Sequence, residues 1–288
     1  MPTLGSKPQG TQPESAKCVT VRARVSANRV SFVIPTRNQA QFIAKCLDSC
    51  FAQGLPDFEI IVVDGGSTDG TQDVLASYGD RVRWTSAKDR GQSDAVNKGV
   101  RSATGDVIAW INSDDYYASP DAVGRILKLF ADDPTVDIAY GDGTMVDTEG
   151  RVLRKYPSLD YRSLEQLVVI PASFVLQPSL LFRRQLFLDV GGLDEDLHFT
   201  LDYELFLRLF PKARTVRHVS VEVARAVYHQ DAKSIRGMRK QIVEFMQVKH
   251  RYATKLALTP TQRVRLYGGM ASLWAYYGAS RLGLIKTT

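Results

Sequence analysis

Short apolar runs alternate with amphipathic segments through the first 120 residues of the chain. The runs at 30–34 and 107–111 are almost wholly apolar, which is typical of strands buried on both faces of a parallel sheet. The other elements predicted in this half are strands at 58–63 and 82–84 and helices at 38–51, 71–78 and 93–102. This alternation with short links predicts an α/β fold in which helices cover a mostly parallel central sheet.

The second half of the chain keeps this pattern and then becomes helical. Ser119 as a cap and Pro120 in the first turn predict a helix over 120–130. The remaining predictions are strands at 138–142, 143–146 and 174–182, a turn at Gly150, and helices at 202–210, from 234 to 252 and from 259 onward. Apolar residues recur at spacings of three and four in the last two helices, so we expect an amphipathic helical appendage over 234–288.

Charge is distributed unevenly along the chain. Residues 211–288 hold fifteen Lys and Arg against three acids, whereas residues 30–210 hold seventeen against twenty-seven, within a formal net charge of +6. A basic C-terminal part on an acidic body favours an anionic partner, such as a membrane surface or a pyrophosphate-bearing acceptor. The basic residues lack the interleaved aromatics of single-strand binders, and the acidic body would repel DNA, so nucleic acid is not expected.

Composition narrows the class of protein. With 288 residues and 44% hydrophobic content, the chain can bury the core of one large domain. Residues 1–28 form a polar tail without an apolar signal core, so we expect disorder there and no secretion. Cys18, Cys46 and Cys50 have neither a disulfide framework nor zinc-site spacing, which favours the cytosol and core packing of Cys46 and Cys50. The 15 uncharged residues between Arg265 and Arg281 are fewer than the roughly 20 that span a bilayer, so a surface-lying or intramolecular helix is expected there.

Two adjacent carboxylates follow the apolar run at 107–111, within Asn112, Ser113, Asp114 and Asp115. Ligands bind at the carboxyl ends of strands in open α/β sheets. Adjacent acids repel each other unless a cation or a ligand's donors share them, and oxygen ligands suit Mg²⁺ or Mn²⁺ carrying phosphates. The alternative is that these residues only cap the next helix.

A second polar stretch runs from Asp64 to Gly70, between a predicted strand and a predicted helix. Its glycines permit close backbone approach, and its Ser, Thr and Asp side chains can hold ribose hydroxyls or base edges. Leu75 stands where a calcium-binding EF-hand needs Glu, and neither dinucleotide-type glycine spacing nor a P-loop lysine is present. A tight structural turn remains the alternative.

A third polar group, Asp94, Asn97 and Lys98, shares one face of the helix at 93–102. These side chains could present together to a ligand. An ordinary solvated helix start is the alternative.

Together, four ordered motifs resemble the family 2 glycosyltransferases over about residues 30–235. They are 31–38 (SFVIPTRN), 62–71 (VVDGGSTDGT), the helix start at 94–99 (DAVNKG) and 112–115 (NSDD). The resemblance implies a GT-A fold over 29–233, with a nucleotide-sugar-binding half at 29–118 and an acceptor half at 119–233. It also implies transfer from a nucleotide sugar with inversion at the anomeric carbon.

The resemblance assigns roles to individual residues. Those it places around the donor are Pro35, Thr36, Arg37, Asn38, Asp64, Gly65, Asp94, Asn97, Lys98 and Asp114. Many relatives carry a second acid at the position of Gly65, where it touches the base, so the donor's base is left open here. Asp115 is implied as the direct ligand of Mg²⁺ or Mn²⁺, with Asp114 nearer the ribose. His229 is implied near the diphosphate or metal, although a lone histidine is often an ordinary surface or core residue.

Asp202 is implied as the base that deprotonates the acceptor hydroxyl, with Glu204 as the fallback. The alternative role of Asp202 is to complement the dipole at a helix N-terminus. The expected function is therefore metal-dependent sugar transfer to a glycan, glycolipid or lipid-linked acceptor, in the cytoplasm or on the inner face of a membrane. The competing hypotheses are a nucleotidyltransferase, for which 35–38 (PTRN) lacks a Gly-rich basic phosphate loop, and a non-catalytic membrane-binding relative.

Overall fold

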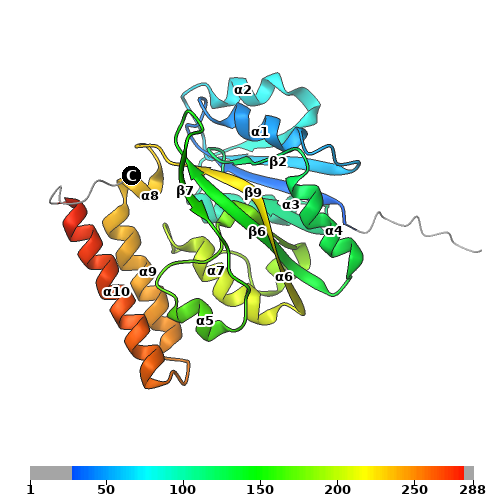
Figure 1. The fold of residues 1–288 in the computed structure, drawn as a ribbon. Helices are drawn as coiled ribbons and strands as arrows, with labels where there is room; N and C mark the ends of the chain where they lie inside the picture. The colour runs from blue at the N-terminus through cyan, green and yellow to red at the C-terminus, as the bar shows by residue number, and fades with distance from the viewer. Residues whose placement is uncertain (1–27, 282–288) are drawn as a thin grey trace, which may run out of the picture.

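One curled sheet of nine strands organises the molecule, in a computed structural model that describes residues 28–281 (Figure 1). The disorder predicted for the N-terminal tail therefore lies outside the described residues, apart from Asn28. Eight strands run in the order β3-β2-β1-β4-β8-β6-β9-β5, and β7 pairs with β6. Their bounds are β1 Val30–Thr36, β2 Phe58–Asp64, β3 Arg83–Ser86, β4 Val107–Trp110, β5 Tyr116–Tyr117, β6 Val136–Val146, β7 Val152–Tyr156, β8 Leu180–Arg183 and β9 Thr215–Val227.

The first half of the sheet is parallel, as the sequence predicts. Strands β2, β1 and β4 are neighbours in register, with β3 on the outer edge of β2. Every residue of β1 and of β4 is buried, because helices cover both faces of the sheet at this point. The second half is mixed: β8 runs antiparallel to both β4 and β6, whereas β6 and β9 are parallel.

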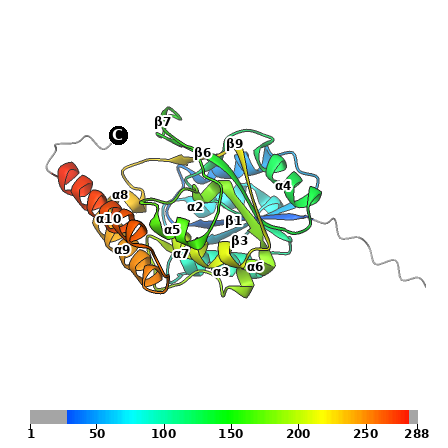
Figure 2. The ribbon, with the colours of Figure 1, turned by 60° about the horizontal axis from the view of Figure 1, so that its bottom comes forward.

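Helices lie on both faces of the sheet (Figures 1 and 2). Side chains of β1 alternate between two cores, with Val33 in one and Phe32 and Ile34 in the other. The helices are α1 Ile43–Phe51, α2 Thr71–Ser77, α3 Gln92–Ser102, α4 Ala122–Asp132, α5 Leu164–Val169, α6 Arg184–Asp189, α7 Leu201–Leu209, α8 Lys233–Arg236, α9 Met238–Ala253 and α10 Pro260–Arg281. Short 3₁₀ turns occupy Gly79–Arg81, Gln177–Ser179 and Phe210–Lys212.

Several predicted bounds are wrong. The strand expected at 174–182 is β8 alone, because Pro178 lies in a 3₁₀ turn just before it. The helix expected from 38 begins only at Ile43, since Asn38 takes a left-handed conformation with φ 53°. The two strands expected at 138–146 form the single strand β6, and the helix expected from 234 breaks at Gly237 between α8 and α9.

The C-terminal helices α9 and α10 pack against the body of the protein. Val248, Leu258, Leu266 and Met270 belong to the same core as the helices on that face of the sheet. Gly269 of α10 lies so close to Pro171 that a Cβ there would meet the ring at 2.8 Å. Among the helices of residues 28–281, none is long and apolar enough to cross a membrane.

Candidate active site

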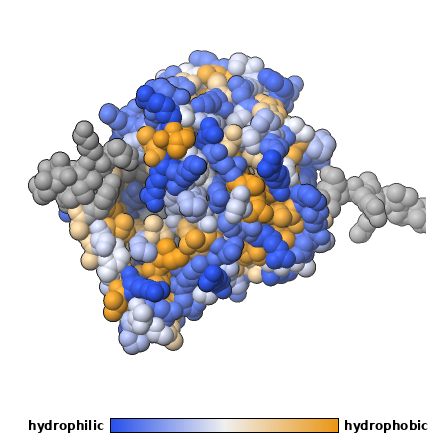
Figure 3. All heavy atoms as spheres, viewed as in Figure 1, coloured by the Kyte–Doolittle hydropathy of each residue, from blue (hydrophilic) through white to orange (hydrophobic). Residues whose placement is uncertain are grey.

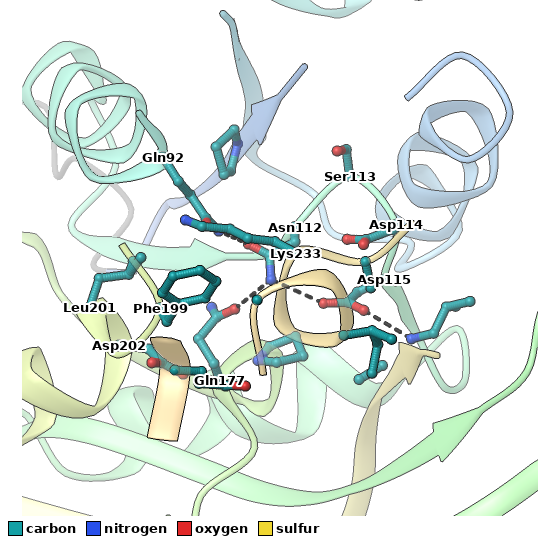
Figure 4. Close-up of a pocket in the computed structure, with 18 of the residues that line it drawn as sticks. Gln92, Asn112, Ser113, Asp114, Asp115, Gln177, Phe199, Leu201, Asp202 and Lys233 are labelled. Carbon is teal, nitrogen blue, oxygen red and sulfur yellow. Dashed lines mark hydrogen bonds between the residues drawn. The ribbon is translucent and has the colours of Figure 1, made fainter. Parts of the chain in front are cut away.

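A pocket of about 1270 Å³ opens at the carboxyl ends of β1 and β4. Its wall combines the end of β1, the loop before α3, residues 112–115, the start of α7 and the segment 226–241. In Figure 4, Asp202 and Phe199 lie on one side of the view and Asp114 and Asp115 on the other, with Asn112 and Gln177 between them. The pocket therefore brings together acids that are about 90 residues apart in the chain.

The two adjacent acids have different environments. Asp115 is 6% exposed, and its two oxygens accept hydrogen bonds from the Val227 N–H at 3.0 Å and the Asn112 amide at 3.2 Å. Asp114 is more exposed, and its Oδ2 lies 3.1 Å from Nε2 of His229. Burial raises the pKa of Asp115 well above its usual value, and the charge of Asp114 raises it further.

Asp114 and His229 are the residues that would hold a divalent cation. A carboxylate oxygen and an imidazole nitrogen meet there, and an added positive charge would offset the repulsion between the neighbouring acids. Mg²⁺ and Mn²⁺ sites commonly combine one or two protein ligands with substrate phosphates. Among residues 28–281, no group of three or more His, Cys, Asp or Glu side chains is arranged to hold a metal.

Asp202 faces the same pocket from the first turn of α7. Burial raises the pKa of this carboxyl, although the N–H of Tyr203 and the charge of Lys233 act in the opposite direction. A raised pKa strengthens a carboxylate as a proton acceptor. Lys233 stands nearby, where its Nζ lies 3.3 Å from Gln92 Oε1.

Glu204, the fallback base, lies outside the pocket lining. It is 4% exposed and is bound by the Arg208 guanidinium and, at 2.9 Å, by the Tyr252 hydroxyl. Its carboxylate therefore connects α7 to α9.

The residues predicted around the donor divide into two groups. Pro35, Thr36, Arg37 and Asp114 line the pocket. The others, which are absent from the lining, are Asn38, Asp64, Gly65, Asp94, Asn97 and Lys98.

Members of the second group make internal contacts that hold the loops around the pocket. Asp64 is fully buried and accepts from Ser67 N–H at 3.0 Å and from Ser86 Oγ at 2.5 Å. Asn38 binds the same loop through Thr68 N–H at 2.9 Å.

The three polar residues predicted to share one face of α3 have different partners. Asp94 is 2% exposed and pairs with Lys98 at 2.7 Å. Asn97 binds the backbone of Leu193 through both its oxygen and its nitrogen, at 2.8 and 3.0 Å. These contacts fix α3 against the loop that leads to α7.

Unsatisfied buried polar atoms gather at the pocket. Thr36 Oγ1, Gln39 Oε1 and Trp110 Nε1 have no hydrogen-bond partner among the described residues, and all three residues line the pocket. Such atoms are rare in folded proteins because leaving them unpaired costs free energy. A ligand bound in this pocket would supply partners for these three atoms.

Sequence reasoning missed Asp89, Phe199 and Glu244. Asp89 and Phe199 line the pocket, and Glu244 of α9 accepts hydrogen bonds from the N–H groups of residues 198–200, just before Asp202. The Asp-x-Gly spacing of Asp89 and Gly91 was the one signal in the sequence for a turn at a strand end. No local pattern could have paired Glu244 with a loop 44 residues away.

The model of the family described as "Glycosyl transferase family 2" matches residues 31–191. The chain belongs to glycosyltransferase family 2. This glycosyltransferase is 31% identical over 205 residues to a "PGL/p-HBAD biosynthesis glycosyltransferase" of Mycobacterium bovis, covering 69% of this chain and 77% of that protein. It is also 31% identical over 215 residues to a chondroitin synthase of Pasteurella multocida, covering 74% of this chain and 22% of that protein.

Solved structures show the same fold at low sequence identity. The S. aureus TarS fragment 1–349 in complex with UDP has a TM-score of 0.64 at 18% identity, covering 90% of this glycosyltransferase and 76% of that chain. The mannosyltransferase PcManGT of Pyrobaculum calidifontis, in complex with GDP-Man and Mn²⁺, has a TM-score of 0.59 at 20% identity, covering 86% and 70%. The fold of this glycosyltransferase is therefore of the GT-A type, as its motifs imply.

Proposed function

We propose that this enzyme transfers a sugar, with inversion, from a nucleoside diphosphate sugar to a hydroxyl group of a glycan or glycolipid acceptor. The observation that carries the proposal is that one pocket joins the acids after β4 to Asp202 across an open space. An inverting displacement needs the leaving group and the base on opposite sides of the sugar, and these two groups of acids lie on opposite sides of the pocket.

The donor's diphosphate is assigned to the side of Asp114 and His229. A divalent metal bound there would neutralise the charge that develops on the departing diphosphate, as a Lewis acid does. We therefore assign the role of direct ligand to Asp114 instead of Asp115, because Asp114 is more open and lies beside His229, whereas Asp115 is almost fully buried. Asp115 then holds the loop in place.

Asp202 is assigned the role of base. It would accept the proton of the acceptor hydroxyl as that oxygen attacks the anomeric carbon, while the bond to the diphosphate breaks. The surroundings that raise the pKa of Asp202 favour this transfer. Holding donor and acceptor in one pocket supplies a further part of the acceleration, because the reaction becomes effectively unimolecular.

The acceptor is proposed to be a glycan or glycolipid at the inner face of a membrane. The names of two relatives support the class, since one acts in PGL/p-HBAD biosynthesis and another is a chondroitin synthase. We assign the acceptor to the part of the pocket lined by α8 and the start of α9, where Arg236, Arg239 and Lys240 lie. These basic residues suit an acceptor near anionic headgroups.

A thermal-shift screen of nucleotide sugars with Mn²⁺, Mg²⁺ or EDTA tests the donor class. A ligand at 100 times its Kd stabilises the native state by about 2.7 kcal/mol, so one donor should raise the Tm by several degrees only when metal is present. Release of the sugar from that donor should require the same metal. A protein whose Tm responds to no nucleotide sugar would contradict the proposal.

A further inference from the structure

A carboxylate and a glycine meet at the edge of the pocket beyond β2. Gly65 directly follows β2, and Asp89 lies in the loop between β3 and α3. A Cβ atom on Gly65 would lie 2.6 Å from Oδ2 and 3.1 Å from Cγ of Asp89, closer than real side chains approach. The missing side chain at Gly65 therefore creates the space that the Asp89 carboxylate occupies.

Asp89 is held in this place by one of its two oxygens. The Gly91 N–H donates to Oδ1 at 3.0 Å, as in a turn that begins with Asp. Among residues 28–281, Oδ2 has neither a hydrogen-bond donor nor a direct ion pair, and the Lys233 ammonium interacts with this carboxylate only at longer range. Because Asp89 lines the pocket, Oδ2 is open to a bound molecule.

Thr36 supplies a second unsatisfied atom beside Gly65. Its carbonyl accepts the Gly65 N–H at 2.9 Å, and its side chain is 5% exposed. Its hydroxyl oxygen has no hydrogen-bond partner among the described residues, although the residue lines the pocket. Thr36 and Asp89 therefore lie on either side of Gly65, where Thr36 has a buried hydroxyl without a partner among the described residues and Asp89 has an oxygen that faces the pocket.

The order of the strands places this spot at one end of the donor. Strands β4, β1, β2 and β3 are consecutive neighbours, with Asp114 beyond β4 and Asp89 beyond β3. At roughly 4.8 Å per strand, the two positions are separated by about 14 Å along the edge of the sheet. A nucleoside diphosphate with its phosphates beside Asp114 and His229 would extend along this edge and bring its nucleoside to Thr36, Gly65 and Asp89.

We infer that Asp89 reads the donor's base by accepting a hydrogen bond from a ring N–H, so that the donor carries uracil, thymine or guanine. These bases carry a hydrogen on the ring nitrogen at the Watson–Crick edge, whereas the corresponding ring nitrogen of cytosine and adenine carries a lone pair. Cytosine and adenine can donate only from their exocyclic amino group, and a carboxylate that accepts there also meets the repulsion of the adjacent ring lone pair. This inference rests on the proposed function, since it assumes a nucleotide donor.

Calorimetry of the full chain with UDP, TDP, GDP, CDP and ADP in Mn²⁺ tests the inference. The wild type should bind at least one of the first three about tenfold more tightly than CDP and ADP. Asp89→Asn should reduce this ratio to within about threefold, because an amide can donate to the lone pair of cytosine or adenine. Preference of the wild type for CDP or ADP, or an unchanged ratio in Asp89→Asn, would overturn the inference.

Two further outcomes distinguish base reading from a ribose contact and from a donor that is not a nucleotide. An equal loss of affinity for all five nucleotides in Asp89→Asn would assign the contact to the ribose and overturn base reading. If the folded wild type bound none of the five nucleotides, the proposal of a nucleotide donor would be contradicted, and with it this inference. The other results would contradict only the role of Asp89 in reading the base.

Substitutions at two glycines test the contact without replacing Asp89 itself. Gly65→Ala adds the Cβ that displaces the Asp89 carboxylate, so the base preference should fall as it does in Asp89→Asn. Gly124→Ala is the matched control, because Gly124 lies in α4, outside the pocket lining. Its added Cβ would make only an ordinary contact with Leu55, at 3.9 Å. Full preference in Gly65→Ala would contradict the contact on which the inference is built.

Discussion

At the scale of single residues, the adjacent acids Asp114 and Asp115 have different roles because their neighbours differ. Asp115 is enclosed and satisfied by Val227 and Asn112, whereas Asp114 is more open and meets His229. The raised pKa of Asp115 therefore reflects its burial, and its carboxyl group holds the Val227 N–H and the Asn112 amide.

Alanine variants of the two acids should separate these roles. Asp114→Ala should leave the Tm of the free protein close to the wild-type value but remove the stabilisation by nucleotide that depends on Mn²⁺. Asp115→Ala should lower the free energy of unfolding by about 1–3 kcal/mol, because the buried Val227 N–H loses its acceptor. Thermal unfolding with and without Mn²⁺ and nucleotide measures both effects, and the reverse pattern would restore Asp115 as the ligand.

The base assignment predicts a split between binding and chemistry. Asp202→Asn should lower kcat by about 10²–10⁴-fold, as expected for loss of general base catalysis, with donor affinity retained. Asp196→Asn, an exposed change just before α7, is the matched control. Retention of kcat in Asp202→Asn would exclude Asp202 as the base.

The same carboxyl sets the direction of the pH dependence. Because burial raises the pKa of Asp202, the base becomes protonated at a higher pH than an ordinary aspartate does. Activity should therefore fall with decreasing pH through that raised pKa, above the usual value of about 3.9. The acid limb of the kcat profile measures this shift, and a limb at or below that usual value would contradict it.

At the scale of elements, α9 supports the active site by binding the segment just before α7. Glu244 accepts from the N–H groups of His198, Phe199 and Thr200 at 3.0, 2.7 and 2.7 Å, and so caps the N-terminus of α7. Burial alone would raise the pKa of Glu244, but these donors hold it below the usual value. Helix α9 thus fixes the turn that presents Asp202.

Removal of this cap should affect turnover more than donor binding. Glu244→Ala should lower stability by about 1–3 kcal/mol, because three N–H groups lose their acceptor. It should also reduce kcat by up to about 10²-fold, since a displacement of about 1 Å in a catalytic group has that effect. The donor Kd should stay within about twofold of the wild-type value. The control is Glu149→Ala in the exposed turn between β6 and β7, and an unchanged kcat in Glu244→Ala would contradict the positioning role.

Because Lys249 is buried, we expect the docking of α9 to depend on pH. It is fully buried, donates to the carbonyl oxygens of Val168 at 2.8 Å and of Ile170, and burial lowers its pKa to about 7. The unfolded chain binds this proton up to a pKa of about 10.4. Folding therefore releases a proton between these two values, and stability should rise with pH across that window.

Comparison with Lys249→Met tests this linkage. The stability of the wild type relative to the variant should increase from pH 7 to pH 9, with a slope of at most about 1.4 kcal/mol per pH unit. Below pH 7 the difference should level off, because both states of the wild type then bind the proton. A difference that stays constant from pH 7 to pH 9 would show that Lys249 remains charged when buried.

At the scale of the whole molecule, α10 presents a second apolar face. Leu266 and Met270 pack on the body, while Val264 and Tyr267 are 72% and 46% exposed. In Figure 3, hydrophobic atoms also reach the surface at the lower left, where Figure 1 places α5 and α10. Because Arg263 and Arg265 stand beside these exposed apolar residues, we expect this part of the surface to bind an anionic membrane.

Vesicle sedimentation tests this surface. The protein should bind vesicles that contain phosphatidylserine more than neutral vesicles, and added salt should weaken the binding. The double change Val264→Asn and Tyr267→Asn should reduce it by at least about fivefold, since apolar burial and charge act together. Val152→Asn, on the exposed β7, is the control. Equal binding by the double variant would place the contact elsewhere.

Local pattern predicted much of the fold because β1 and β4 are apolar throughout and the polar motifs stand at strand ends. It failed where the backbone conformation depends on distant contacts. Asn38 looks like the start of a helix but is held in a left-handed turn by Ser67 and Thr68. Asp94 and Asn97 share a predicted face, yet Asn97 is directed to Leu193 by a loop that no spacing rule places there.

The sequence alone determined the family, the α/β alternation and the acids at the end of β4, because these follow from local periodicity and contiguous motifs. Only the tertiary structure decided which oxygen meets His229, that Asp89 fills the space beside Gly65, and that Glu244 caps the helix of Asp202. The physical reason is that hydrogen bonding and desolvation of a side chain depend on neighbours that are distant in the chain, and chain folding alone selects those neighbours.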